Sequence, residues 1–373
     1  MRTRRDRREF CLSVQLPDKL GRNSQARVRG EVMKKVLFGT TALIAAASFA
    51  GSAYAQPIEL SIGGKQEMFF GFGDVNDNAG EEWSNTGMAT DTELYFTGST
   101  TLDNGITVRA IIQLEAEDNG DRNADEQAIQ LSGGFGALQI GQRQGYVGQM
   151  QYTSPNAGGV VGWDDYEGWL EFSRNVGDNY YTDDDLSVSY VTPSFFGFSA
   201  AGTYAPDSSN NDDSAFEEWN TTGSAYKDLM AVGLAFDNEF SGVGIHADVT
   251  YNYQFGPGAT NDRQLVRGGA AVSYMGFEVG GAYGHWLVDG TDNDAEFWNA
   301  GASYQNGPYG VAFVYQSGWY DAGNVDQDSF QFSGNYALGP GIDLGAAVFH
   351  GNEERAGPDR ETTGALMAIG LYF

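Results

Sequence analysis

Apolar and polar residues alternate along most of the chain, and residues 242–255 show this pattern most clearly. From Val243 to Phe255 every second residue is apolar, whereas the residues between them, such as His246 and Asp248, are polar or glycine. A period of two is typical of a β-strand with one apolar face and one polar face. About ten residues of a tilted strand cross the hydrocarbon layer of a bilayer. The pattern therefore predicts a strand that crosses a membrane.

The same alternation recurs and predicts sixteen strands. They are 58–72, 92–102, 106–117, 127–135, 137–141, 186–192, 198–204, 229–236, 242–255, 265–274, 277–286, 297–305, 309–316, 329–338, 342–350 and 363–373. Short connections such as Asn104-Gly105, a strong hairpin signal, alternate with long acidic ones. Short turns at one rim and long loops at the other are typical of outer-membrane barrels. We expect an all-β, transmembrane, antiparallel β-barrel of sixteen strands.

One long segment, residues 142–185, interrupts the alternation. It is rich in charged and aromatic residues, including Trp163, Tyr166 and Trp169. A connection of this length without a strand pattern is usually functional in a compact domain. We interpret it as a constriction loop that folds into the lumen of the barrel and narrows the pore.

The N-terminal residues have a different texture. Residues 33–55 contain two lysines, then an apolar run, then Ala53-Tyr54-Ala55, which is the layout of a secretory signal peptide. The apolar run is too short for a transmembrane helix. We expect a single barrel domain over 56–373. Residues 1–32 are basic and precede a second methionine, so we interpret them as a misassigned start, with a genuine basic leader as the alternative.

The charge balance is strongly acidic. The whole chain carries a formal charge of −29, and removal of residues 1–55 leaves 10 basic and 46 acidic residues, a charge of −36. This charge argues against nucleic acid or anionic lipid as a partner and favours cations. The single cysteine, Cys11, lies in the leader, so the exported domain is predicted to have no disulfide and to depend on its closed hydrogen-bonded sheet.

Strand parity predicts which charges face the lumen. On 106–117, the apolar residues from Ile106 to Leu114 occupy one face, which leaves Arg109 and Glu115 on the other. The same test directs Lys65 and Glu67 inward, and Arg267 as well; Arg143 continues the inward face of the strand before the long insertion. A charge at mid-bilayer on the lipid face costs about 2–4 kcal/mol, which favours placement in the lumen.

Several short stretches resemble one family. They are the residues Ile58 to Gly64, the hairpin at Asn104-Gly105, the sequence Leu138 to Arg143 before the insertion, and the ending Gly370 to Phe373. With the signal peptide, these resemble Gram-negative general diffusion porins, specifically the alphaproteobacterial type known from Rhodobacter. The resemblance covers 56–373 and implies a sixteen-stranded barrel, a homotrimer and an inward third loop. Outer-membrane lipid, lipopolysaccharide and small hydrophilic solutes would be its other partners.

In such porins, acidic groups on the inward loop face basic groups on the barrel wall. The resemblance implies that Lys65, Arg109 and Arg143 form the basic wall, with Arg267 elsewhere around the lumen. The acidic residues expected on the loop are Asp164, Asp165, Glu167 and Glu171. For each of them, a solvated loop charge is the alternative.

An acidic stretch between two predicted strands suggests calcium. Asp118, Asp121 and Asp125 offer oxygen ligands at short spacing but do not have the spacing of an EF-hand loop. Simple solvation is the alternative. No other cofactor is expected.

Signals for catalysis are weak. The sequence has no Gly-x-Ser-x-Gly, Walker or His-Glu-x-x-His motif, so we do not expect an enzyme. The function predicted is a passive, water-filled, cation-preferring channel for small hydrophilic solutes in the outer membrane. The alternatives are a substrate-specific channel, which the aromatic residues of the insertion favour, and a non-porous surface or adhesion barrel.

Overall fold

The computed structural model describes most of the chain. The described residues are 57–76, 84–116, 124–170, 185–207, 226–256, 262–290 and 293–373, without the side chains of Asp125 and Asp207. The predicted signal peptide and the residues before it lie outside these ranges. In the part of the chain that is described, no helix is long and apolar enough to cross a membrane.

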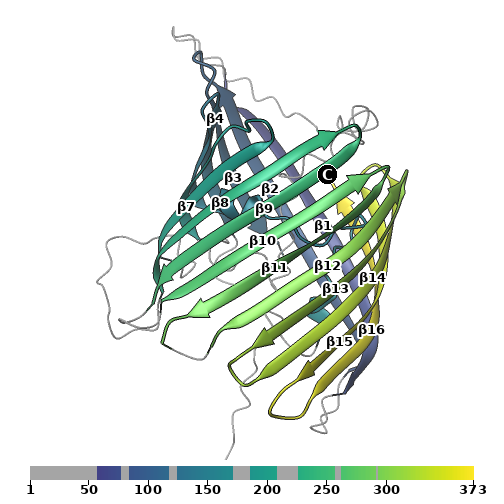
Figure 1. The fold of residues 1–373 in the computed structure, drawn as a ribbon. Helices are drawn as coiled ribbons and strands as arrows, with labels where there is room; N and C mark the ends of the chain where they lie inside the picture. Colours follow the sequence, from purple (N-terminus) through teal and green to yellow (C-terminus); the bar gives the residue numbers. More distant parts are fainter. Residues whose placement is uncertain are drawn as a thin grey trace, which may run out of the picture.

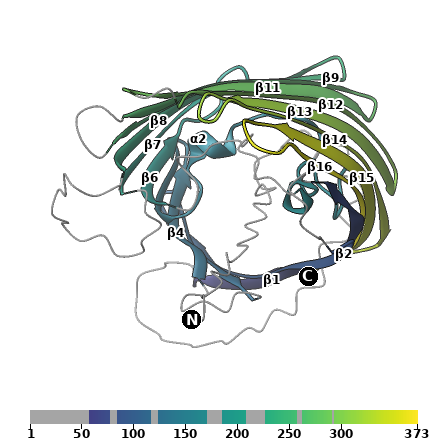
Figure 2. The same cartoon turned by 90° about the horizontal axis from the view of Figure 1, so that it is seen from below.

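Sixteen antiparallel strands form one closed barrel, in which each strand pairs with its neighbours in sequence and β1 pairs with β16. The strands are tilted (Figure 1) and form a ring when viewed from below (Figure 2). Their bounds are β1 Glu59–Asn76, β2 Thr86–Thr101, β3 Thr107–Glu115, β4 Ala124–Gly133, β5 Gly136–Gln142, β6 Leu186–Val191, β7 Phe198–Asp207, β8 Lys227–Phe240, β9 Val243–Phe255, β10 Arg263–Tyr274, β11 Phe277–Val288, β12 Ala295–Asn306, β13 Tyr309–Tyr320, β14 Val325–Gly339, β15 Ile342–Glu354 and β16 Arg360–Tyr372.

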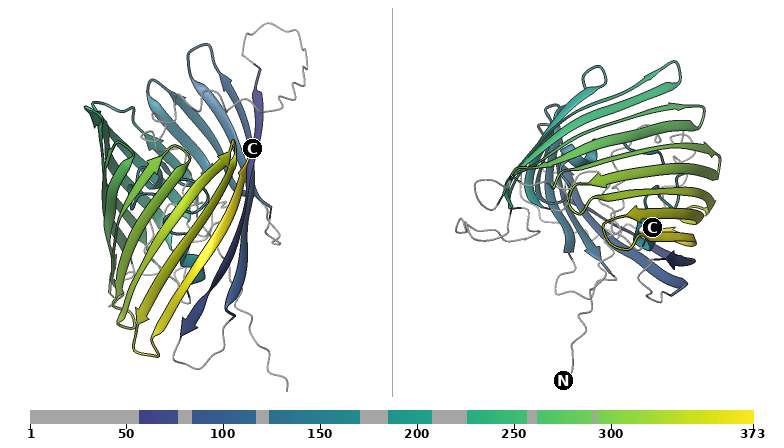
Figure 3. Two further views of the ribbon diagram at one scale, coloured as in Figure 1. Left: turned by 90° about the vertical axis from the view of Figure 1, so that its right-hand side faces the viewer. Right: turned by 60° about the horizontal axis from the view of Figure 1, so that its bottom comes forward.

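Closure depends on the first and last strands. The β1–β16 register runs from Lys65 opposite Tyr372 to Asn76 opposite Glu361, and Figure 3 shows the two strands side by side, purple beside yellow. The terminal residue adds to it, because Gly64 N–H donates to the Phe373 carbonyl at 2.9 Å. Each of the described strands therefore has a neighbour on both sides, which is the closed arrangement that a sheet in lipid requires.

The sixteen predicted strands are confirmed, and most differ from the prediction only at their ends. The largest difference is at β2, which starts at Thr86 and not at residue 92. Strand β14 starts four residues before the predicted position, and β1, β8, β13 and β15 each end four residues beyond it. Of the ten residues added at the starts of β2 and β14, four are Gly or Asp, which are depleted in strands. Pairing with a long neighbour, β1 in the case of β2, overrides this local preference.

The predicted turn chemistry is also present. Gly105 has a φ of 82°, and its N–H donates to the Leu102 carbonyl at 2.8 Å. At the β10–β11 turn both Met275 and Gly276 have positive φ, 49° and 85°. Two consecutive left-handed residues form the type I′ turn that matches the twist of a hairpin.

The two faces of the sheet differ as the alternation predicts. In β9, for example, His246, Asp248 and Asn252 are buried, whereas Val249 and Tyr251 are 50% and 38% exposed. Side chains on the inner face of a barrel converge on its axis and those on the outer face diverge, so the buried polar set is the inward one. The exposed apolar set forms the outer face, where aromatic residues such as Phe277 and Tyr309 lie at strand ends.

The long insertion begins and ends close to the predicted bounds. Strand β5 ends at Gln142 and β6 begins at Leu186. Between them lie a short helix α2, Tyr146–Gln149, and a 3-10 turn η3, Glu167–Trp169. Residues 171–184 lie outside the described part of the chain.

Candidate functional site

The described part of the insertion, residues 143–170, contacts inward-facing residues on one strand after another. Helix α2 packs against β6, β7 and β8. The later contacts are, in chain order, Tyr152 with Asp248 of β9 and Arg267 of β10, Ser154 with Asn299 of β12, Val161 with Asn335 of β14, Tyr166 with Ser329 of β14 and Gln316 of β13, and Trp169 beside Gly71 of β1. This part of the insertion therefore lies along the wall over most of the strands.

Amide side chains of the wall bond to the main chain of the insertion. Asn335 accepts a hydrogen bond from Val161 N–H and donates one to the Val161 carbonyl, both at 2.9 Å. Asn299 Oδ1 accepts from Ser154 N–H at 3.0 Å, and Gln331 donates to the Gly162 carbonyl at 2.6 Å. A buried main-chain group without a partner is costly, and these amides take the place of a neighbouring strand.

An apolar cluster holds the far end of the described insertion. Its buried members are Phe69, Val160, Val161, Tyr166, Leu170, Ala347, Phe349, Leu366 and Ala368. Four of these belong to the insertion and five to β1, β15 and β16. Burial of an aromatic or large aliphatic side chain contributes about 1.5–3 kcal/mol, so the cluster fixes this part of the insertion against the wall.

Glycines on the wall make room for the insertion. A Cβ atom at Gly310 would lie 1.8 Å from the Ala157 carbonyl oxygen, and one at Gly269 would lie 2.0 Å from that of Tyr152. A Cβ at Gly71 would lie 2.3 Å from the ring of Trp169. Only glycine allows the main chain of the insertion to approach these strands so closely.

The predicted basic wall residue Lys65 is buried, with 6% of its surface exposed. Its Nζ lies 2.7 Å from Asp91 Oδ2 and 2.7 Å from Glu93 Oε1, both on β2. The carboxylates are themselves 5% and 8% exposed. One ammonium group thus lies between two carboxylates on the neighbouring strand.

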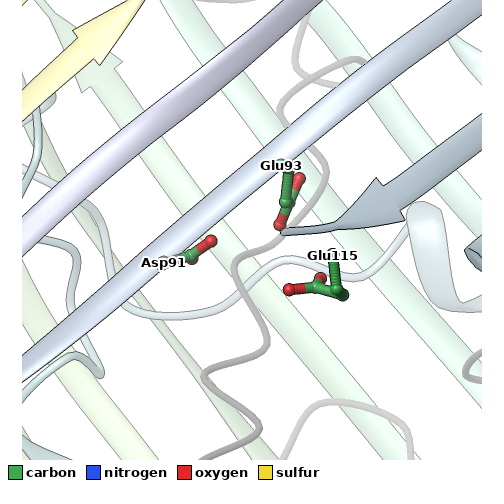
Figure 4. Close-up of side chains that lie close together, drawn as sticks. All are labelled: Asp91, Glu93 and Glu115. Atoms are coloured by element: carbon green, nitrogen blue, oxygen red, sulfur yellow. The ribbon is translucent and has the colours of Figure 1, made fainter. Parts of the chain in front are cut away.

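Two further carboxylates lie close to this group. Glu67 is opposite Asp91 in the β1–β2 register, and Glu115 is opposite Glu93 in the β2–β3 register. Oxygens of Asp91, Glu93 and Glu115 lie within 4.8 Å of one another (Figure 4), an arrangement that could hold a metal ion. We call Glu67, Asp91, Glu93 and Glu115 the acidic wall group. With Lys65 included, its formal charge is −3.

The other predicted basic residues differ in their surroundings. Arg143 is buried and bonds Glu126 at 2.7 Å. Arg267 is 1% exposed and bonds Asp248 at 2.9 Å. Arg109 is partly exposed and donates to Gln130 Oε1 at 3.4 Å; among the described residues it takes part in no ion pair.

Tyr146, in α2, lies near two of these arginines. Burial raises the pKa of its phenol, although Arg143 and Arg109 both act in the opposite direction. The phenol of tyrosine is neutral near neutral pH, and a raised pKa keeps it neutral. Tyr146 therefore adds no negative charge to this part of the wall.

The predicted acidic residues of the insertion are only partly described. Asp165 is 5% exposed and accepts a hydrogen bond from Gly162 N–H. Glu167 accepts one from Gln316 Nε2 at 2.7 Å, and Asp164 is partly buried. Glu171 lies outside the described residues. So do Asp118, Asp121 and the side chain of Asp125, so the calcium prediction stays untested.

Sequence reasoning missed several wall residues. Asp91 lies outside the predicted second strand, which begins at residue 92, whereas β2 begins at Thr86. Asn299 and Asn335 lie inside predicted strands on the polar face, but an amide gives no signal that distinguishes a clamp from ordinary lining. Because β2 starts at Thr86, Asp91 and Glu93 both lie within the strand, on the face of the sheet that carries Lys65.

Comparison with solved structures shows the same fold. Over 85% of this chain, the "Anion-selective porin from Comamonas acidovorans" matches over its full length with a TM-score of 0.65 and 18% identity. The trimer form of OmpT from Vibrio cholerae matches with a TM-score of 0.58 and 12% identity, covering 85% of this chain and 100% of that one. A mutant of the Rh. blastica porin matches with 0.54 and 13%, covering 84% and 100%.

Sequence comparison gives the family. No curated protein sequence is significantly similar to the chain. The family model described as "Gram-negative porin" matches residues 40–356, which include almost all of the sixteen-stranded barrel. Porins are channels of the outer membrane and not enzymes, as the sequence predicts. This chain belongs to the Gram-negative porin family.

Proposed function

We propose that this outer-membrane porin is a passive, water-filled, cation-preferring channel for small hydrophilic solutes, narrowed by the 142–185 insertion lying in its lumen. The contacts of residues 143–170 with inward-facing side chains from β6 to β1 support the narrowing. Passive selectivity requires only a pore of suitable width and a lining of suitable charge.

The observation that carries the cation preference is the pairing of the wall cations. Lys65 lies between Asp91 and Glu93, and Arg143 is bonded to Glu126. Paired cations attract anions weakly, because their field is largely cancelled at a distance. The acidic wall group and Lys65 together have a net negative formal charge. Arg109 is then the main positive charge on the inner face of β1 to β3.

The fold alone does not fix the sign of selectivity. The Comamonas acidovorans porin, which matches with a TM-score of 0.65, is described as anion-selective. At 18% identity its lining residues need not be those of this chain. We therefore base the cation preference on the charges of this chain and not on similarity.

The substrate-specific alternative has weaker support. It relied on Trp163, Tyr166 and Trp169 as an aromatic track. Trp163 and Tyr166 are 2% and 0% exposed, and Trp169 packs against the apolar cluster of the insertion. Aromatic rings buried in this way hold the insertion and are not free to stack on a passing solute.

We also propose that the protein is a homotrimer. The outer face of the barrel is apolar, and one OmpT structure is described as a trimer form. Chemical cross-linking in detergent, followed by denaturing gel analysis, should give a ladder that ends at three copies. A ladder ending at one or two copies would contradict this assembly.

Planar bilayers test the proposed function. Refolded protein, shown to be folded by heat-modifiable gel mobility, should give stepwise conductance in KCl. Under a salt gradient, the reversal potential should have the sign of a cation-preferring pore. Silence from folded protein would overturn the channel, and a reversal potential of the opposite sign would overturn the cation preference.

A further inference from the structure

One ion pair of the wall is completely buried. Asp248 of β9 and Arg267 of β10 are bonded at 2.9 Å, and both side chains are 0% exposed. The two strands are neighbours in the sheet (Figure 1). Two buried charges are costly to desolvate and by themselves are weak evidence for stability, so the pair needs another explanation.

Both members of the pair contact the main chain of one residue in the insertion. Asp248 Oδ1 accepts a hydrogen bond from Tyr152 N–H at 2.6 Å, and Arg267 Nη2 donates to the Tyr152 carbonyl. The pair therefore offers Tyr152 an acceptor and a donor, as the edge of a β-strand would. Asn335 makes the same two bonds to Val161 through its amide.

The surroundings of Tyr152 fix it from two more directions. Gly269, next but one to Arg267 on β10, leaves no room for a Cβ, since such an atom would lie 2.0 Å from the Tyr152 carbonyl oxygen. The phenol donates to Asp237 Oδ2 at 3.0 Å, and its ring lies 5.0 Å from that of His246. Together these contacts hold Tyr152 against β8, β9 and β10.

We propose that Asp248 and Arg267 are positioning residues that clamp the insertion at Tyr152 and so set the width of the pore. Arg267 then does not act as a pore-lining charge. This inference rests on the proposed function, because it requires that the insertion narrow the lumen.

The first test uses a matched pair of arginines on β10. Arg267 and Arg263 lie on the same face of the strand, but Arg263 bonds Gln254 and lies over the ring of Tyr226. Arg267→Gln should release the insertion at Tyr152. The channel should then show several conductance levels, or close under applied voltage, where the wild type shows one conductance step. Arg263→Gln, which removes the same charge, should keep the wild-type step.

Arg267→Lys separates a clamp from a lining charge. Lysine keeps the positive charge but loses the planar fork that reaches Asp248 and the Tyr152 carbonyl together. The clamp predicts that Arg267→Lys has the same multiple levels as Arg267→Gln. A wild-type step for Arg267→Lys, with a reversal potential shifted only in Arg267→Gln, would show that Arg267 acts as a lining charge.

The second test leaves all charges unchanged. Gly269→Ala adds a methyl group where the Tyr152 carbonyl lies, whereas a Cβ at Gly268 meets nothing closer than 3.4 Å. Gly269→Ala should alter the conductance step, and Gly268→Ala should not. Both variants are first checked for folding by heat-modifiable mobility.

The outcomes distinguish the two proposals. A silent wild-type protein would mean that the proposed function fails. A conducting wild-type protein whose step is unchanged in Arg267→Lys and in Gly269→Ala would overturn the clamp and leave the channel intact.

Discussion

The inner wall has two regions that use polar residues in different ways. On β9 to β14 the inward residues that contact the insertion include amides, glycines and one buried ion pair. On β1 to β3 the inward residues include a cluster of charges, in which Lys65 bonds Asp91 and Glu93 of the neighbouring strand β2. The first region holds a segment in place, and we propose that the second gives the pore its charge.

This difference explains why charge type alone is a poor guide to a pore lining. Arg267 and Arg109 both face inward by parity, yet Arg267 is 1% exposed and Arg109 is partly exposed. The distinction depends on which part of the wall the insertion covers. Variants in the two regions should therefore differ in what they change, which is stability, conductance or selectivity.

Removing the ammonium group from the charged region should have the largest effect. Lys65→Met leaves Asp91 and Glu93 buried without their cation, which costs about 3–5 kcal/mol when one partner of a buried ion pair is lost. The midpoint of urea unfolding, followed by heat-modifiable mobility, should fall. Lys227→Met, at the start of β8, is the control. Equal midpoints in the two variants would contradict the buried pairing.

Filling a glycine gap in the clamping region should have the next largest effect. Gly310→Ala places a methyl group where the Ala157 carbonyl lies, and overpacking of this kind costs about 1–3 kcal/mol. Thermal unfolding of the barrel should shift downward. At Gly334 a Cβ would lie 3.8 Å from its nearest neighbour, so Gly334→Ala should unfold like wild type. A similar loss in both variants would argue against a gap made for the insertion.

Reversing the charge of Arg109 should change selectivity with little change in stability. Arg109→Glu removes the main opposing charge of the β1–β3 region, so the reversal potential in a salt gradient should shift toward stronger cation preference. Arg355→Glu changes the same charge outside the strands, between β15 and β16. Screening over about 8 Å at 0.15 M salt should weaken its effect. A larger shift for Arg355→Glu would place the selective charges at the rim.

Neutralising one member of the acidic wall group should have the smallest effect. Glu115→Gln removes one of four carboxylates, so cation preference should decrease slightly while the conductance step stays close to wild type. Glu354→Gln, an exposed position at the end of β15, should leave the reversal potential unchanged. No difference between these two variants would remove Glu115 from the pore lining.

Much of the fold could be predicted because the alternation of apolar and polar residues identifies the strands and their two faces directly. Val243 to Phe255 has one apolar face whatever surrounds it, and Asn104-Gly105 specifies its own turn. Residues Thr86 to Asp91 lie outside the predicted second strand because Gly87 and Asp91 weaken the strand signal, and in the structure they pair with the extended strand β1. Asp91 is one of these residues, so the prediction does not include it as a partner of Lys65.

The site was harder to predict because partners come from distant parts of the sequence. Asn335 and Val161 are bonded although 174 residues separate them, and Asn299 and Ser154 are separated by 145. Nothing in the local sequence around Asn335 distinguishes it from an amide that faces water. The predicted charges could be assigned a face by parity, but their ion pairs could not be assigned.

We infer that the insertion covers the inner face of β9 to β14 and leaves the charged residues of β1 to β3 to line the conducting path. Single cysteines test it in a Cys11→Ser background, in which the chain has no other cysteine. We would compare Glu115→Cys with Gln331→Cys, whose parent glutamine is 1% exposed and bonds Gly162. A charged thiol reagent added during conductance should reduce the current through Glu115→Cys and leave Gln331→Cys unchanged. Reaction at Gln331→Cys with none at Glu115→Cys would show instead that the β9–β14 region lines the conducting path.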